Sequence, residues 1–225
     1  MPSRSVECFV DTVDTDPRKR CRPHLEAWEK DYTCRGRLWG GAVVDLPAVS
    51  KGFLVLELGS GDGKTLSALP GGCRAVALDV SAQALRLASQ VREDAAFIQA
   101  DAGCLPLRES CFDAVFAFHV AGHLLADGRR ALAAETARIL KLGGRIFFRD
   151  FSELDMRAGQ GAEVEPGTFR RGSGIVTHYF REDEVAELFC SQRIQQAGIV
   201  THCWKMRIKG KDHLRAEVQA TFLKI

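Results

Sequence analysis

The sequence lacks any long hydrophobic run and any strong excess of one charge sign. No apolar stretch approaches the ~20 residues that a membrane-spanning helix needs, and the formal net charge is only +2. The N-terminus carries Glu7, Asp11, Asp14 and Asp16, which is typical of neither a secretory signal nor a transit peptide. We therefore expect a cytoplasmic protein that does not associate with membranes.

Metal-binding and redox motifs built on cysteine are also missing. The eight cysteines form no Cys-x-x-Cys pair, which excludes a zinc ribbon and a thioredoxin motif. His119 and His123 have an i, i+4 spacing, but no glutamate follows His119 and no third ligand is evident. We expect reduced thiols and no metal centre.

Short apolar runs alternate with amphipathic stretches from residue 53 onward, a pattern typical of β–α units in a parallel sheet. Strands are predicted at residues 53–58, 75–78, 95–100, 114–118 and 145–148. Ser81 is a good N-cap for one helix, and a second helix is predicted over residues 131–140, closed by Gly143 and Gly144.

The C-terminal third begins with residues 152–174, which contain six glycines or prolines and no hydrophobic period. Such a long irregular segment is more typical of a functional lid than of a passive connection. A short helix is predicted at residues 182–189. Strands at 204–209 and 215–223 are joined by a tight turn, so they must be antiparallel. Alternation in the first of them places Lys205, Arg207 and Lys209 on one cationic face.

A glycine-rich turn follows the first predicted strand, with the sequence Glu57-Leu58-Gly59-Ser60-Gly61-Asp62-Gly63-Lys64-Thr65. A phosphate-binding P-loop would need glycine at position 58, which is leucine. A dinucleotide fingerprint would need glycine at position 64, which is lysine. The spacing resembles instead the first motif of the class I methyltransferases, E-x-G-x-G-x-G.

This resemblance implies that S-adenosylmethionine is the cofactor and S-adenosylhomocysteine the product. Glycine then serves close approach of the backbone to the methionine and ribose, and the two cationic groups of the cofactor favour carboxylates around them. Glu57 could face the methionine ammonium, Asp79 at the end of the second strand could accept both ribose hydroxyls, and Asp101 could accept from the adenine amino group. The remaining expected cofactor contacts are Gly59, Ser60, Gly61, Val80, Ala102, Phe118 and His119.

Shorter motifs on both sides of this core resemble the methyltransferase-like family that makes 3-methylcytidine in tRNA. Trp28 and Tyr32 match its W-x-x-x-Y, and both would contact the cofactor as part of an N-terminal lid. Arg37-Leu38-Trp39 resembles its R-H-W. Further similarities are Arg149-Asp150-Phe151, residues 171–174 with residues 178–180, and the closing residues 217–224.

Together these patterns predict one α/β domain with the Rossmann-like class I methyltransferase fold, whose seven-stranded sheet is mostly parallel with an antiparallel terminal strand. Residues 1–50 would form the lid, 51–150 the cofactor-binding core, and 151–225 the substrate loop and terminal strands. Ligands in open α/β sheets bind beyond the carboxyl ends of the strands. Arg149 and Asp150 at such an end are therefore the predicted catalytic residues, with the Asp150 carboxylate stabilising positive charge on the acceptor.

Three functions remain open from the sequence. The first is transfer of a methyl group to RNA, with N3 of a tRNA cytidine as the leading acceptor. A second is a small-molecule methyltransferase of the same fold, which would have an enclosed apolar pocket under residues 152–174. The third is a non-catalytic S-adenosylmethionine-binding interaction protein, whose protein partner the sequence does not name.

Overall fold

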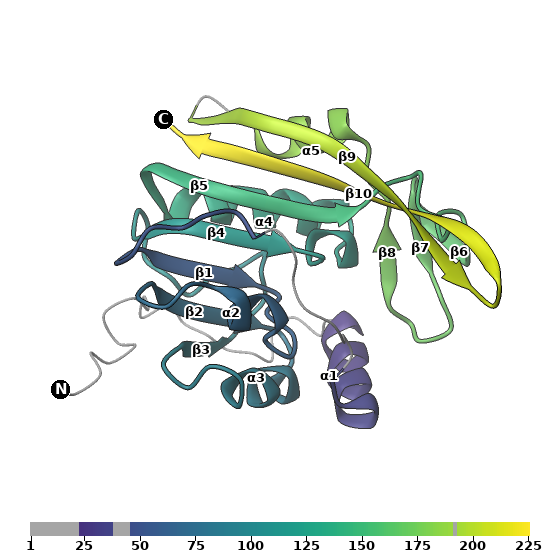
Figure 1. Ribbon diagram of the computed structural model, residues 1–225, viewed down its shortest axis with the longest axis horizontal. Helices are drawn as coiled ribbons and strands as arrows, with labels where there is room; N and C mark the ends of the chain where they lie inside the picture. Colours follow the sequence, from purple (N-terminus) through teal and green to yellow (C-terminus); the bar gives the residue numbers. More distant parts are fainter. Residues whose placement is uncertain (1–22, 38–45, 191–192) are drawn as a thin grey trace.

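A seven-stranded sheet forms the centre of the computed structural model, which describes residues 23–37, 46–190 and 193–225 (Figure 1). Its strand order is β3-β2-β1-β4-β5-β10-β9. The strands are β1 (Leu54–Leu58), β2 (Arg74–Asp79), β3 (Ala96–Gln99), β4 (Phe112–Phe118), β5 (Leu140–Phe151), β9 (Ile194–Ile208) and β10 (Lys211–Lys224). The basic cluster at residues 18–22, and Leu38 and Trp39 of the flanking motif, lie outside the described residues.

Strand directions confirm the predicted fold class. Strands β1 to β5 pair in parallel, whereas β10 is antiparallel to both of its neighbours, β5 and β9. The last strand of the chain is therefore the one that runs against the rest of the sheet. Its insertion between β5 and β9 brings residues about seventy positions apart in sequence side by side, with Glu217 opposite Phe151.

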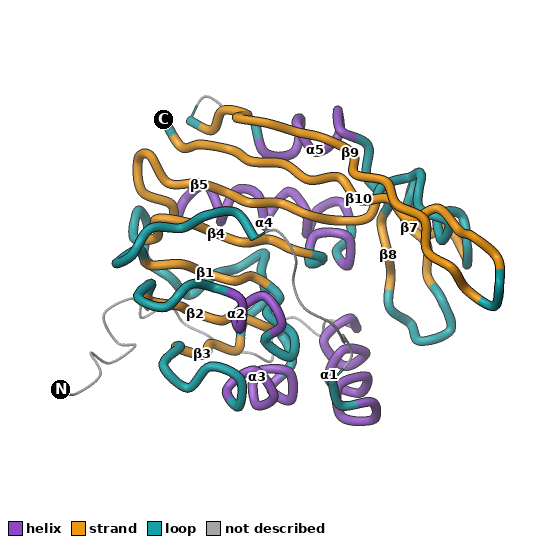
Figure 2. Tube along the Cα trace, viewed as in Figure 1, coloured by secondary structure: helices purple, strands orange, loops and turns teal. Residues whose placement is uncertain are grey.

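Helices cover both faces of the sheet because its central strands are buried on both sides (Figure 2). Leu54, Leu56 and Leu58 of β1 pack in one cluster with side chains of α4 (Ala126–Ile139) and α5 (Glu182–Phe189). Val55 points the other way, into a cluster with α2 (Lys64–Ala68) and α3 (Ala82–Ser89). Ser81 caps α3 as predicted, since its hydroxyl accepts a hydrogen bond from the Ala84 N–H.

The predicted boundary between the second helix and the fifth strand was wrong. Helix α4 begins five residues earlier than expected, at Ala126, and ends at Ile139. Leu140 already has extended backbone angles and pairs with Phe112, so β5 includes Gly143 and Gly144. Pairing with β4 therefore outweighs the usual role of a glycine pair in ending a helix.

Residues 152–174 are not an irregular loop. They contribute to a small antiparallel sheet of β6 (Ala162–Glu165), β7 (Thr168–Arg170) and β8 (Val176–His178), which projects from one end of the molecule in Figure 1. Pro166 and Gly167 form the turn between β6 and β7, and Gly167 has a φ of 71°. The glycines and prolines therefore mark hairpin turns, which this dipeptide typically indicates.

The last two strands are longer than predicted, and Lys209 does not belong to either of them. β9 ends at Ile208, and Lys209 and Gly210 form the turn to β10 with φ values of 49° and 80°. The predicted stripe is thus reduced to Lys205 and Arg207, both exposed on β9. Among the described helices, none is long and apolar enough to cross a membrane.

Candidate functional site

A cavity of about 740 Å³ opens beyond the carboxyl ends of the parallel strands. This volume lies within the range of small-molecule and cofactor sites. Helix α1 (Pro23–Arg35) forms one side of the cavity, and β9 and β10 form another. All but one of the predicted site residues line it, namely Trp28, Tyr32, Glu57, Gly59, Ser60, Gly61, Asp79, Val80, Asp101, Ala102, Phe118, His119 and Arg149.

The glycine-rich turn leaves no room for side chains. Gly59 and Gly61 have positive φ values of 67° and 53°, which residues with a Cβ rarely adopt. A Cβ on Gly59 would lie 2.8 Å from the side chain of Val120, and one on Gly61 would lie 2.5 Å from the Tyr32 hydroxyl. The backbone is therefore exposed to the cavity at close range, as the motif predicts.

Glu57 is a buried carboxyl group at the floor of the cavity, 3% exposed. Burial is the largest influence on its pKa and raises it to about 8, although a hydrogen bond to Thr65 acts in the opposite direction. Within the described part of the chain, Glu57 Oε2 and Ser60 Oγ are buried without a hydrogen-bond partner. Buried polar atoms of this kind are rare in folded proteins, and here both belong to residues that line the cavity.

Asp79 holds the glycine turn against the start of α3. One of its oxygens accepts a hydrogen bond from the Gly61 N–H at 2.8 Å, and the other accepts from the Ser81 N–H at 2.9 Å. Burial raises the pKa of Asp79 to about 6, while these backbone donors lower it. The carboxyl group is thus fixed at the cavity wall by the backbone of two separate segments.

Helix α1 brings its aromatic side chains to the cavity. The rings of Trp28 and Tyr32 are 6.0 Å apart, and the Trp28 ring packs edge-on against His123 at 4.8 Å. Glu29 of the same helix accepts a hydrogen bond of 2.6 Å from the Ser81 hydroxyl. The sequence analysis missed Glu29, because nothing in its local spacing indicates which partner α1 packs against.

The structure does not bring Asp150 to the cavity wall. Side chains alternate along β5, so Arg149 and Phe151 line the cavity while Asp150 points to the opposite side, 1% exposed. Asp150 accepts hydrogen bonds from the N–H groups of Gly122 and Phe151. Its Oδ1 lies 3.8 Å from His119 Nδ1. Burial alone would raise the pKa of Asp150, but His119, His123 and the Gly122 N–H hold it below its usual value.

Arg149 and His119 occupy the end of the cavity next to β10. The Arg149 guanidinium lies over the Phe118 ring at 4.6 Å, a cation–π arrangement. His119 has a φ of 54°, which is uncommon for a residue other than glycine and is found mainly in turns and functional sites. Its Nε2 lies 3.5 Å from Glu217 Oε1.

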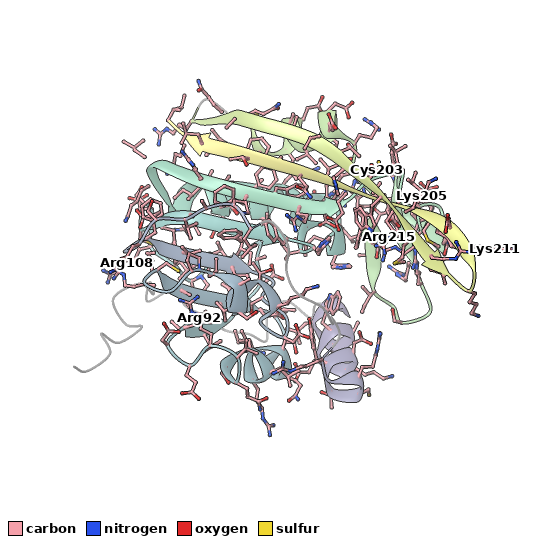
Figure 3. The ribbon with its side chains drawn as sticks, in the orientation of Figure 1. Arg92, Arg108, Cys203, Lys205, Lys211 and Arg215 are labelled. Carbon is pink, nitrogen blue, oxygen red and sulfur yellow. The ribbon has the colours of Figure 1, made fainter. Side chains whose placement is uncertain are left out.

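The β9–β10 wall of the cavity was missed entirely. It is formed by His202, Trp204, Arg215, Glu217 and Gln219. Figure 3 labels Arg215 on β10 beside Cys203 and Lys205 of β9. A signal for this wall exists in the sequence: Ala216, Val218, Ala220 and Phe222 alternate as buried apolar residues, so the odd-numbered positions of β10 face the other side.

No group of three or more histidine, cysteine, aspartate or glutamate side chains that could hold a metal ion occurs among the described residues.

Comparison with known proteins identifies the family. A family model described as a methyltransferase domain matches residues 56–148. A demethylmenaquinone methyltransferase of Thermobifida fusca is 31% identical over 181 residues, which cover 73% of this chain and 72% of that protein. The chain belongs to the class I S-adenosylmethionine-dependent methyltransferases.

Other members of this methyltransferase family act on different acceptors. The tRNA N(3)-cytidine methyltransferase METTL2 of Gallus gallus is 27% identical over 168 residues, which cover 68% of this chain and 45% of that protein. This chain spans about half the length of the first curated relatives that it matches. A solved S-adenosylmethionine-dependent methyltransferase of Methanosarcina mazei has the same fold, with a TM-score of 0.64, 20% identity, and coverage of 79% of this chain and 94% of that one.

Proposed function

We propose that this methyltransferase transfers the methyl group of S-adenosylmethionine to a base in RNA. The observation that supports the proposal best is the wall formed by β9 and β10. It lines the cavity with the aromatic ring of Trp204, the cationic group of Arg215 and the carboxylate of Glu217. Lys205 and Arg207 alternate with Trp204 along β9, so they lie on the opposite, exposed face of the same strand. Aromatic faces that stack on bases, next to cations that contact phosphates, are typical of proteins that bind single-stranded RNA.

The donors and acceptors around the glycine turn fit the cofactor. Glu57 Oε2 and Ser60 Oγ are buried and have no hydrogen-bond partner in the described chain. Glu57 would accept hydrogen bonds from the methionine ammonium, and Ser60 would hydrogen-bond the methionine or the ribose. Asp79 would accept the ribose hydroxyls, and Asp101 would accept from the adenine amino group beside Ala102. Val80 and Phe118 would pack on the adenosine, and Trp28 and Tyr32 would cover it from α1.

When bound, S-adenosylmethionine supplies a methyl group activated by a positively charged sulfur. The protein then contributes mainly proximity and alignment, which can account for a large part of the rate of such transfers. Arg149 lies on the cavity wall and would contact the acceptor or its phosphate. Asp150 is a positioning residue, because it acts on the cavity through His119 and the Gly122 N–H.

A small-molecule acceptor remains the second candidate, and the demethylmenaquinone methyltransferase relative favours it. That candidate predicts an enclosed apolar pocket under residues 152–174. The structure describes all of these residues, and none of them lines the cavity. The neighbouring hollow of about 480 Å³ is lined by the charged side chains of Glu153, Arg181 and Glu184 as well as apolar groups. This arrangement favours the RNA acceptor.

The test is to incubate the protein with methyl-labelled S-adenosylmethionine and either unfractionated small RNA or a metabolite extract. We expect label in the RNA fraction. Label in the metabolite fraction alone would favour the small-molecule acceptor. Cofactor binding without label in either fraction would favour the non-catalytic binding protein. Asp79→Asn serves as the inactive control, because it keeps the shape but removes the charge that accepts the two backbone hydrogen bonds.

A further inference from the structure

The end of the cavity next to β10, where we place the methyl acceptor, is lined by the carboxylate of Glu217. This group comes from β10 and not from β5. Asp150 of β5 faces away from the cavity, whereas Glu217 of β10 lines it. The register of β10 against β5 places Glu217 opposite Phe151, one residue beyond Asp150. Glu217 therefore stands at the carboxyl end of the parallel strands, where ligands of open α/β sheets bind, although it comes from the antiparallel strand.

The side chains of His119 and Arg149 lie on two sides of the Glu217 carboxylate. His119 Nε2 lies 3.5 Å from Glu217 Oε1, and Arg149 Nε lies 3.9 Å from Glu217 Oε2. His119 Nδ1 in turn lies 3.8 Å from the buried carboxylate of Asp150. The His119 imidazole thus lies between two carboxylates. Glu217 lines the cavity, and Asp150 is buried behind the cavity wall. Only 13% of the Glu217 side chain is exposed, so it has little conformational freedom to lose when an acceptor binds beside it.

The flat surfaces beside Glu217 restrict the kind of acceptor. The His202 and Trp204 rings stack on β9 with centroids 5.7 Å apart. His202 is opposite Glu217 in the strand register, and Trp204 is opposite Arg215. Aromatic side chains of this kind bind planar rings by stacking. The acceptor subsite therefore combines stacking surfaces with one negatively charged group.

We propose that Glu217 is a catalytic carboxylate that faces the acceptor atom, and that the acceptor is a neutral nitrogen of a planar heteroaromatic ring. This proposal rests on the proposed methyltransferase function. In the transfer, the nitrogen lone pair forms the bond to the methyl carbon while the carbon–sulfur bond breaks and its electron pair stays on sulfur. The positive charge passes to the ring, and no proton has to be removed. A fixed carboxylate stabilises that cation more than the neutral ring, as catalysis requires.

The first test needs no acceptor, because a carboxylate that faces the reacting methyl group also faces the charged sulfur. Calorimetry gives the affinities of the full chain for S-adenosylmethionine, which carries this charge, and for S-adenosylhomocysteine, which does not. In Glu217→Gln we expect the preference for S-adenosylmethionine to fall about tenfold, the scale of one charge–charge interaction. Glu217→Asp keeps the charge and should keep most of the preference. Glu187→Gln, which removes an exposed carboxylate on α5, should not change it.

The second test measures transfer to the RNA or metabolite fraction that the wild-type protein labels. We expect kcat of Glu217→Gln to fall about 10²-fold, the typical effect of removing one electrostatic stabiliser, with a much smaller change in KM. An unchanged cofactor preference in a folded Glu217→Gln variant would overturn the proposal. If the wild-type protein binds neither form of the cofactor, the methyltransferase function itself fails. If the preference falls but no fraction is labelled, the Glu217 assignment stands and the proposed acceptor classes are wrong.

Discussion

Two residues on the floor of the cavity, Glu57 and Asp79, are carboxyl groups that the fold keeps out of water. Burial raises their pKa values to about 8 and about 6. A buried acid with a raised pKa near neutrality typically belongs to a functional site. We interpret Glu57 as an acid that becomes charged when the cationic ammonium group of the cofactor replaces the missing solvent, whereas Asp79 is already mostly charged at neutral pH.

Cofactor affinity should therefore depend on pH through Glu57. In the free protein the group is mostly protonated below pH 8, and the methionine ammonium would lower its pKa on binding. Binding then releases a proton, so affinity should rise as the pH increases from about 6 toward 8. Calorimetry in buffers of different ionisation enthalpy measures both effects. The Glu57→Gln variant should bind the cofactor more weakly, and its affinity should no longer depend on pH over this range. If the variant shows the same pH dependence as the wild type, Glu57 is not the group that causes it.

Among the elements, α1 contributes more to the cavity than its few contacts with the sheet suggest. It supplies Trp28 and Tyr32 to the wall and is attached to the start of α3 through Glu29 and Ser81. A positively charged sulfur is a good partner for aromatic faces. These contacts support the N-terminal lid that the spacing of the two aromatic residues predicts.

Deletion of residues 1–40 should weaken S-adenosylmethionine binding about tenfold or more, because it removes both aromatic rings. The far-ultraviolet circular dichroism of the sheet should remain. Glu29→Gln should weaken binding less, whereas Lys30→Gln on the exposed face of α1 should have no effect. Binding by the truncated chain as tight as that of the full chain would show that α1 is not a lid.

The exposed side chains of Lys205 and Arg207 make β9 the second element with a testable role. If both contact RNA phosphates, replacing them with glutamine should reduce the slope of log binding constant against log salt by roughly 1.5 to 2 units. Lys209 lies in the turn and should contribute less. Lys51 and Arg108 serve as controls. They precede β1 and β4 and therefore lie at the amino-terminal ends of the parallel strands, and Figure 3 shows Arg108 far from Lys205. Replacing these two should leave the slope unchanged. An unchanged slope for the β9 pair would mean that its cations are only solvated.

At the scale of the whole molecule, Asp155 connects two parts of the structure. It lies in the segment that leads to the small sheet, and it binds the main sheet through a side chain of β10. The residue is 3% exposed, and its carboxylate accepts hydrogen bonds from Arg157 Nε at 2.8 Å and from Arg215 Nε at 2.7 Å. Arg157 and Arg215 lie over the Phe151 ring at 3.8 and 5.4 Å. One buried charge thus positions both arginines at the cavity end of β5 and β10.

Asp155→Asn should reduce the free energy of unfolding by about 3 kcal/mol, the scale of breaking a buried ion pair. For a chain of this size, we expect the thermal midpoint to fall by roughly 6–12 °C. Burial alone would raise the pKa of Asp155, but Arg157 and Arg215 hold it below 3.8. Its stabilisation is therefore present above pH 3.8 and is lost as the pH falls through the lower folded value. The difference between wild type and variant should shrink accordingly in acid.

Asp183→Asn provides the matched control, because Asp183 also pairs with an arginine but is exposed. Its thermal midpoint should stay at the wild-type value. Equal effects of the two substitutions would mean that Asp155 is an ordinary surface ion pair.

The local parts of the site were predictable from the sequence by itself. The glycine spacing after β1 excluded two nucleotide-binding motifs, and Glu57, Asp79 and Asp101 were identified because the carboxyl ends of parallel strands meet at one edge. The cap of α3 and the short helix at residues 182–189 were correct because their signals are contained within a few residues.

Only the tertiary structure decided which side chains line the end of the cavity next to β10. Asp150 and Glu217 lie far apart in the sequence, and the β5–β10 register places one beneath the wall and the other on it. A shift of one residue in that pairing would exchange the two faces of β10. Such a register depends on packing across the whole sheet, which is why a local motif indicated the cofactor while the long-range pairing of the last strand determined which side chains line the cavity beside β5.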